Sequence, residues 1–323
     1  MNILFCLCLT LLLGCSAYDQ CATVAASDLT ALPMHLSESG LFDPATQNVA
    51  ANVRPYAPAF ELWSDGAVKR RWIWLPPGTV IDTSDADDWQ FPRGARLWKE
   101  FTRDGVRVET RLLWKTGDGE ADWVGAAYVW NGNDAVLTGD GVVDALGTEH
   151  DVPAADRCFG CHGGRKSRVL GFSAVQLGNS PGPLTLTDAV SAGLLSQPPA
   201  GSLELPGSAA DQRVLGLLHA NCAHCHNARR PAAMGPRCFD PQNDIDLALS
   251  TSALGDFTQT GLARTVIGKS VKPGDAAGSK LFKLYTHRGA PNLWGPSQMP
   301  PLATEKVDEA GAELLGRWID GLR

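Results

Sequence analysis

Alternating apolar and polar positions mark several β-strands in the first half of the chain. The clearest run is 106–114, where Val106, Val108, Thr110, Leu112 and Trp114 share one face and Arg107, Glu109 and Arg111 take the other. A period of two residues is what a half-buried strand requires. Similar runs span 68–75, 95–102 and 123–130, with turn sequences at 116–119 and 138–141. We therefore predict an antiparallel all-β domain, a sandwich or barrel, over residues 41–150, preceded by a polar tether at 16–40.

The second half of the chain has the period of helices. Ser208 and Asp211 match a capping box, and Val214, Leu217 and Leu218 follow at helical spacing, which predicts a helix that ends near 222. At the C-terminus an apolar stripe on a helix begun near Thr304 comprises Val307, Ala310, Leu314, Leu315, Trp318, Ile319 and Leu322. We expect these two helices to pack together in a mainly α domain at 206–323. Residues 151–205 between the two parts are punctuated by Pro and Gly.

Composition adds little to this division. The chain has 323 residues, 44% hydrophobic and 20% charged, with a net charge of -7, which is typical of a soluble globular protein of one large or two to three small domains. The negative charge lies outside residues 206–323 and argues against nucleic acid or anionic lipid as a partner. Eight of the ten Trp residues lie between Trp63 and Trp130. Aromatic side chains in strands more often fill a core than bind sugars, and we favour that interpretation.

Two pentapeptides carry the candidate chemistry. Cys158-Phe159-Gly160-Cys161-His162 and Cys222-Ala223-His224-Cys225-His226 both read Cys-x-x-Cys-His, the attachment site of a c-type haem. Thiols three positions apart reach the two vinyl groups of the porphyrin, and the adjacent His ligates the iron. The sequence thus predicts two covalently bound haem c groups, with Cys158, Cys161, Cys222 and Cys225 as anchors and His162 and His226 as ligands. The alternatives are a four-thiolate zinc site or a redox dithiol, which leave both His unexplained.

Four basic residues flank the first motif: Arg157, Arg165, Lys166 and Arg168. They either neutralise the haem propionates or form a solvated basic loop, and the sequence leaves both interpretations open. Residues 151–205 are then a first haem-binding segment that links the two larger parts.

The N-terminus predicts export. Residues 3–14 form an apolar run too short to span a bilayer, as in a secretory signal, although no Lys or Arg precedes it. The run ends in Leu12-Leu13-Gly14-Cys15, which resembles the lipobox of bacterial lipoproteins, where the Cys is acylated after cleavage; Ser16 at the next position implies sorting to the outer membrane. We expect a signal peptide at 1–15 and a lipoprotein on the periplasmic side. Cys21 and Cys238 then remain, either as a disulfide or as free thiols.

Residues 206–323 resemble a single cytochrome c domain. The points of likeness are a helix that runs into Cys222-Ala223-His224-Cys225-His226, a long loop, the stretch Gln298-Met299-Pro300-Pro301 and an amphipathic terminal helix. The resemblance implies Met299 as sixth ligand of the second haem, with Met234 as the near competitor.

More widely, the chain is similar to a family of bacterial diheme c-type cytochromes with a β-rich N-terminal half. The similar stretches are Glu61-Leu62-Trp63-Ser64-Asp65, 108–113, 128–131, 219–227 and Pro273-Gly274-Asp275. Cys238, in the loop after the second motif, departs from that pattern. The resemblance implies haem but names no substrate.

Three functions fit these features. The first is an electron carrier that passes single electrons between redox partners such as a periplasmic dehydrogenase, with the membrane reached only through the lipid anchor. The second is a diheme peroxidase with an open site on the first haem, for which His150, His219 and His287 are the free candidate ligands. The third is a Trp-rich binding module with sensory haems.

Overall fold

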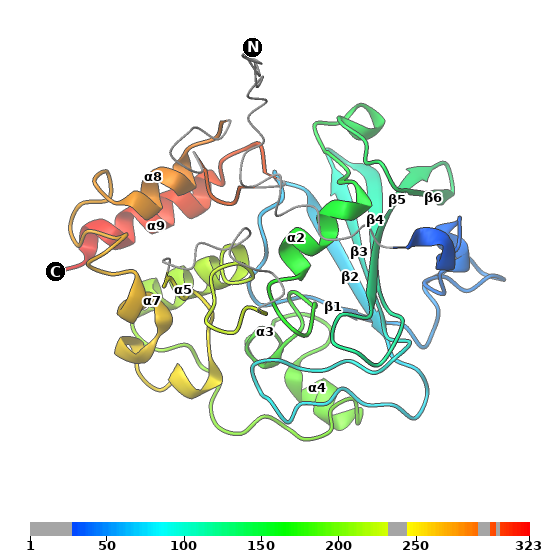
Figure 1. The fold of residues 1–323 in the computed structure, drawn as a ribbon, viewed down its shortest axis with the longest axis horizontal. Coiled ribbons are helices and arrows are strands. Elements are labelled where there is room, and N and C mark those ends of the chain that lie inside the picture. Colours follow the sequence, from blue (N-terminus) through cyan, green and yellow to red (C-terminus); the bar gives the residue numbers. More distant parts are fainter. Residues whose placement is uncertain (1–27, 232–243, 290–297, 302–303) are drawn as a thin grey trace, which may run out of the picture.

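The computed structural model describes residues 28–231, 244–289, 298–301 and 304–323. Its centre is a six-stranded antiparallel sheet in simple meander order, β1 to β6 (Figure 1). The strands are β1 (Arg54–Tyr56), β2 (Val68–Trp74), β3 (Arg96–Arg103), β4 (Val106–Lys115), β5 (Trp123–Asn131) and β6 (Asp134–Thr138). Between β3 and β4, Asp104 and Gly105 have φ of 50° and 81°, the left-handed pair that a two-residue hairpin turn needs.

The predicted antiparallel β domain is therefore present, but as one open sheet. Within the described residues β1 and β6 are opposite edges and no second sheet faces the first, so the expected sandwich or barrel is not formed. The reason is that other parts of the chain cover both faces. One face packs on residues 29–53 through a core that includes Leu36, Leu41, Trp72, Trp98 and Trp130.

The N-terminal cover replaces part of the expected tether. Leu36 and Leu41 are fully buried, and the Ser37 side chain donates to Asp134 at 2.7 Å. The Trp98 indole N–H donates to Ser39 Oγ at 3.0 Å. Residues 28–40 are thus part of the folded unit, while 1–27 lie outside the described residues.

The other face of the sheet packs on segments 81–95 and 159–195. Their shared core contains Ile73, Leu97, Leu113, Trp123, Phe159, Phe172 and Leu177. The segment that the sequence assigns to a linker contributes three short helices to this cover, α2 (Cys158–His162), α3 (Ala174–Gly178) and α4 (Leu186–Ser191). Most of the Trp residues lie in these two cores, which agrees with the core interpretation.

The C-terminal part contains α5 (Ala209–Asn221), α7 (Gly261–Thr265), α8 (Lys280–Thr286) and α9 (Glu309–Gly321). The Ser208–Asp211 capping box is confirmed. The terminal helix begins later than predicted, after Asp308, whose side chain caps it by accepting from the Gly311 N–H. Helices α5 and α9 pack together, as expected, and Trp318 donates to Asp211 at 2.8 Å. Figure 1 shows this helical part beside the sheet, with α2 between them.

Short 3-10 helices complete the described chain: η1 (Leu29–Ala31), η2 (Leu36–Glu38), η3 (Ala145–Gly147), η4 (Ala155–Arg157), η6 (Thr251–Ala253) and η7 (Phe257–Gln259). Among the helices of the described ranges, none has the length and apolar character needed to cross a bilayer.

Candidate functional site: two adjacent Cys-x-x-Cys-His segments

The first motif forms a single helical turn that lies on the sheet. Helix α2 spans the motif, and its Cys158 side chain rests on Gly125 of β5. A Cβ at position 125 would lie 3.3 Å from Cys158 Sγ, so glycine leaves the room that this thiol occupies. Burial raises the pKa of Cys158 to about 11, and both thiols of the motif are free.

His162 is oriented by a backbone carbonyl. Its Nδ1 lies 2.6 Å from the carbonyl oxygen of Arg168, which can only accept, so the ring proton is on Nδ1 and Nε2 has the free lone pair. Burial lowers the pKa of His162 to about 4, which keeps the ring neutral. Arg168 has a φ of 59°, a strained value for a residue with a side chain, and donates to the Gly163 carbonyl at 2.9 Å. This is the arrangement by which proteins orient a metal-ligating imidazole.

The second motif follows directly from α5. The N–H of His226 donates to the Cys222 carbonyl at 2.8 Å, and Asn227 Nδ2 donates to the Ala223 carbonyl at 2.8 Å, which together fold the motif into a compact turn. Burial raises the pKa of Cys222 to about 12 and lowers that of His226 to about 4. A protonated thiol and a neutral imidazole are the forms expected of groups held away from water.

The two motifs are in direct contact although sixty residues separate them in the sequence. Gly164, two residues after the first motif, lies against the backbone of His224, and a Cβ there would be 1.6 Å from the His224 carbonyl oxygen. Asn227 Nδ2 also donates to the Gly164 carbonyl at 3.2 Å. Burial acts to lower the pKa of His224, but the thiols of Cys225 and Cys161 outweigh it and raise that pKa. The imidazole of His224 thus lies between one cysteine of each motif.

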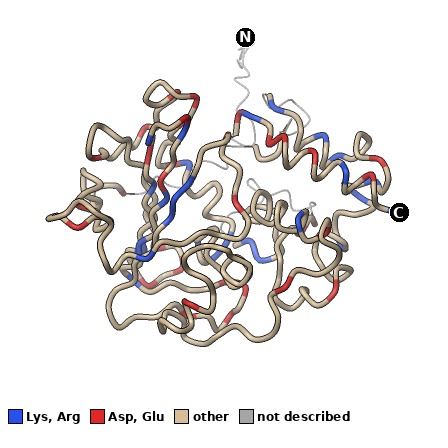
Figure 2. The backbone as a smooth tube through the Cα atoms, turned by 180° about the vertical axis from the view of Figure 1, so that it is seen from behind, with Lys and Arg blue, Asp and Glu red and all other residues tan. Residues whose placement is uncertain are grey.

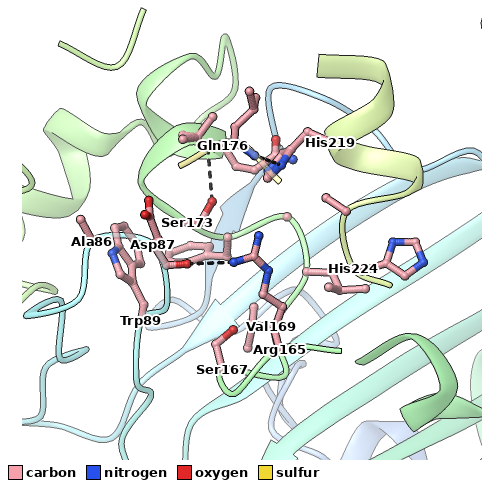
Figure 3. A pocket seen from close by; sticks show the side chains of 16 residues that line it. Ala86, Asp87, Trp89, Arg165, Ser167, Val169, Ser173, Gln176, His219 and His224 are labelled. Atoms are coloured by element: carbon pink, nitrogen blue, oxygen red, sulfur yellow. Dashed lines mark hydrogen bonds between the residues drawn. The ribbon is translucent and has the colours of Figure 1, made fainter. Parts of the chain in front are cut away.

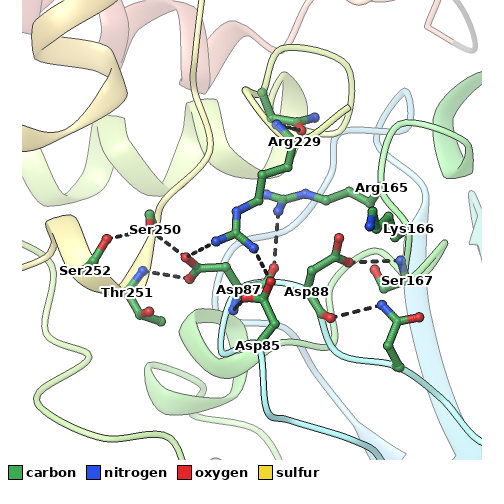
Figure 4. Close-up of polar contacts among 12 residues, drawn as sticks. Asp85, Asp87, Asp88, Arg165, Lys166, Ser167, Arg229, Ser250, Thr251 and Ser252 are labelled. Carbon is green, nitrogen blue, oxygen red and sulfur yellow. Dashed lines mark hydrogen bonds and ion pairs between the residues drawn. The ribbon is translucent and has the colours of Figure 1, made fainter. Parts of the chain in front are cut away.

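An acidic loop between β2 and β3 fixes both segments in place (Figure 4). Asp88 accepts from the Ser167 N–H at 2.9 Å, after the first motif. Asp87 accepts from Ser250 Oγ at 2.6 Å and from the Thr251 N–H at 2.7 Å, and it forms an ion pair with Arg229, just after the second motif. One loop therefore ties both motifs to the sheet.

The candidate histidines for the first haem have other roles in the described structure. His150 Nε2 lies 2.7 Å from Glu109 Oε1, and His287 is exposed. His219 lines a small cavity with Trp89, Arg165 and His224 (Figure 3). Its Nδ1 accepts from the Leu249 N–H at 3.1 Å, which places the proton on Nε2. None of the three has the orientation seen for His162.

Met299 lies beside α8, where its N–H donates to the Leu284 carbonyl at 2.8 Å. Tyr285, which follows Leu284 in α8, lies near Cys222. Burial and Asp308 raise the pKa of the Tyr285 phenol, and Cys222 adds to the rise. The role of Met299 as a ligand stays a prediction. Met234, Cys15, Cys21 and Cys238 lie outside the described residues.

Within the described residues no group of three or more His, Cys, Asp or Glu side chains is arranged to hold a metal ion. A c-type haem needs less of the protein: two free thiols and one oriented imidazole per motif. The first motif meets that requirement through the free thiols and the oriented ring of His162, and the second through its free thiols and the neutral ring of His226.

Sequence reasoning missed two parts of this site: the acidic loop at 85–88 and the charged residues of the sheet face beneath α2. The alternation of side chains along each strand could have indicated these charged residues, because Arg71, Lys99 and Arg111 are cross-strand neighbours on one face of the sheet. No family model, curated protein or solved structure matches this chain.

Proposed function

We propose that the protein is an exported diheme c-type cytochrome that passes single electrons between redox partners. One observation carries the proposal: two Cys-x-x-Cys-His segments from distant parts of the chain meet at Gly164 and His224. Two haem attachment sites in contact provide a short path for electrons. A four-thiolate zinc site would also bring two Cys-x-x-Cys pairs together, but it would give no reason for the oriented ring of His162, and a redox dithiol would explain neither feature.

Each residue of the site has a definite task in this proposal. Cys158 with Cys161, and Cys222 with Cys225, hold the two groups as thioethers, and His162 and His226 each supply an iron ligand. When bound, haem supplies one-electron chemistry at the iron. The Arg168 carbonyl keeps the proton of His162 on Nδ1, which leaves Nε2 for the metal. In the C-terminal part, interpreted as a cytochrome c-like domain, Met299 supplies the sixth ligand of the second haem.

The first test is stoichiometry. The protein, produced together with a haem-attachment system, should retain two haems per chain through denaturing electrophoresis, because the link is covalent. Replacing Cys158 and Cys161 with Ala should remove one haem, and replacing Cys222 and Cys225 should remove the other. A purified chain that binds zinc and shows no haem stain would refute the proposal.

A peroxidase is the second candidate, and one observation favours it. His219 Nδ1 accepts from the Leu249 N–H, so its Nε2 carries the proton and the ring has no lone pair to offer the sixth position of the first haem. An open position is where peroxide would bind. A high-spin ferric signal in electron paramagnetic resonance, together with peroxide turnover, would favour the peroxidase over the electron carrier.

The proposed location rests on the sequence around Cys15. Mass spectrometry of the mature protein should find a lipid-modified Cys15 at the N-terminus. An unmodified N-terminus beyond Cys15 would contradict the lipoprotein assignment and leave the haem assignment unaffected.

A further inference from the structure

A row of three cationic residues crosses the sheet on the face that carries the first motif. Arg71 of β2 is paired in register with Lys99 of β3, and Lys99 with Arg111 of β4. Direct cross-strand neighbours have Cβ atoms about 5 Å apart, and like charges at such positions are destabilising. Figure 2 shows Lys and Arg along these strands. The row therefore needs negative charge to balance it.

The two outer members of the row have carboxylate partners. Arg71 Nη1 lies 2.8 Å from Glu61 Oε1, and Glu61 also faces Lys69. Arg111 pairs with the fully buried Glu109. Glu61 and Glu109 thus pair with three cations, Lys69, Arg71 and Arg111, and Lys99 is a fourth.

Lys99, in the middle, has no such partner. Among the described residues no carboxylate forms an ion pair with its Nζ, which lies over the ring of Phe101, 4.8 Å from the ring centroid. Burial, followed by Arg71, Arg111 and Lys69, lowers the pKa of Lys99 well below its usual value, and the nearby Glu109, which acts to raise it, does not compensate. Such a site is short of an anion.

The row faces the first haem motif. Arg111 lies close enough to Cys158 and Cys161 for each of these groups to contribute to its raised pKa. Lys99 and Arg111 lie close enough to His162 to contribute to the lowered pKa of that ring. On β5, next to Arg111, the small residues Ala127 and Gly125 continue the row's face, and Gly125 contacts Cys158. The cations and the motif thus share one side of the sheet.

The basic residues that flank the motif in sequence are already engaged. Arg168 donates to the Gly163 carbonyl, and Arg165 donates to the Asp87 carbonyl at 3.3 Å. Lys166 pairs with Glu120 at 3.2 Å, and both side chains are more than half exposed. The cations of the sheet are therefore the better candidates to neutralise the haem propionates.

We propose that the Lys99 ammonium, supported by Arg111 and Arg71, binds the propionate carboxylates of the first haem. This inference rests on the proposed function, because it needs haem at Cys158 and Cys161. A haem with two carboxylates supplies the negative charge that the row lacks, and charge-assisted hydrogen bonds are the strong ones. The sheet is then part of the haem site and sets the electrostatic environment of the iron.

The test replaces Lys99 with Met in the holoprotein and measures haem content, both midpoint potentials and the propionate bending bands in resonance Raman spectra. Removal of a cation near the iron favours the ferric form, so the potential of one haem should fall more than that of the other, with two haems still attached. The propionate bands should shift. Lys99→Arg should restore both readouts, and the matched control Lys166→Met, which removes an exposed cation near the same motif, should leave them unchanged.

Three results separate the explanations. If Lys99→Met leaves the potentials and the propionate bands as in the wild type, the inference is wrong. If added acetate shifts the wild-type potential and Lys99→Met abolishes that response without moving the propionate bands, the row binds an external carboxylate, and the assignment to haem is overturned. If the wild type holds no haem, the proposed function fails instead. Should Lys99→Met not fold, Lys99→Gln provides the same comparison with a hydrogen-bond donor retained.

Discussion

Replacing Gly164 with Ala tests the contact between the two motifs directly. The added Cβ would lie 1.6 Å from the His224 carbonyl oxygen, whereas an ordinary carbon–oxygen contact is roughly 3.3 Å. The obstacle is backbone and cannot rotate away as a side chain would. The two segments must therefore separate by about 1.5–2 Å if the difference between these two distances is taken up by the backbone.

The expected cost follows from two contributions. Overpacking of a close contact costs about 1–3 kcal/mol. The hydrogen bond from Asn227 Nδ2 to the Gly164 carbonyl is disrupted as well, at a net cost of about 0.5–1.5 kcal/mol. We expect Gly164→Ala to lower the free energy of unfolding by about 2–4 kcal/mol in all.

The assay is urea unfolding of the oxidised holoprotein, followed by far-ultraviolet circular dichroism and by the Soret band. Gly255→Ala is the matched control, because nothing lies within 4 Å of a Cβ at that position. If Gly164→Ala and Gly255→Ala differ by less than about 0.5 kcal/mol, the range of ordinary surface substitutions, the contact between the motifs does not exist as described.

Three further predictions address the surroundings of the site. Glu109→Gln should cost about 1–3 kcal/mol in thermal or urea unfolding, because it removes the buried carboxylate that pairs with Arg111, whose side chain is 28% exposed. Burial acts to raise the pKa of Glu109, but Arg111 and His150 outweigh it and lower that pKa. The carboxylate therefore contributes stability at neutral pH that is lost as the pH falls through its folded pKa. This acid-induced loss of stability should be smaller in Glu109→Gln. Asp87→Ala should cost about 1–3 kcal/mol, because half-buried donors of Ser250 and Thr251 lose their acceptor. Asp85→Ala, which removes an exposed ion pair, should cost less than about 1 kcal/mol, and equal costs would exclude an anchoring role for Asp87. Met299→Ala should abolish the near-infrared sulfur-to-iron band of the oxidised protein and lower the potential of one haem, and a band that survives would show that another residue is the ligand.

Local signals predicted the parts of this molecule that local interactions determine. The capping box at Ser208 and Asp211 depends on four consecutive residues and was predicted correctly. The strand at 106–115 was also predicted, but its charged positions Glu109 and Arg111 read as a solvent face. Glu109 is fully buried because His150, far along the chain, covers it and contacts its carboxylate at 2.7 Å, while Arg111, which pairs with Glu109, is 28% exposed.

The candidate site divides in the same way. The expected attachment of haem at each Cys-x-x-Cys-His motif depends on five consecutive residues, so the sequence alone predicts this part of the site. The meeting of Gly164 with His224, and the role of the Arg168 carbonyl, depend on how distant segments pack and on a left-handed φ at a residue other than glycine. No pattern in one sequence predicts these.

The cover over the second face of the sheet has a consequence for the order in which the protein is made. The ribosome completes all six strands before it reaches Phe159, Phe172 and Leu177, which close that face. Until they are made, the face that carries Ile73, Leu97 and Leu113 has only segment 81–95 to cover it. The half-buried Cys158 side chain lies against Gly125 in the closed structure, so the haem of the proposed function would have to be joined to that thiol before the cover closes. The proposed function therefore implies an order of events: strand formation, then haem attachment at Cys158, then closure of the cover.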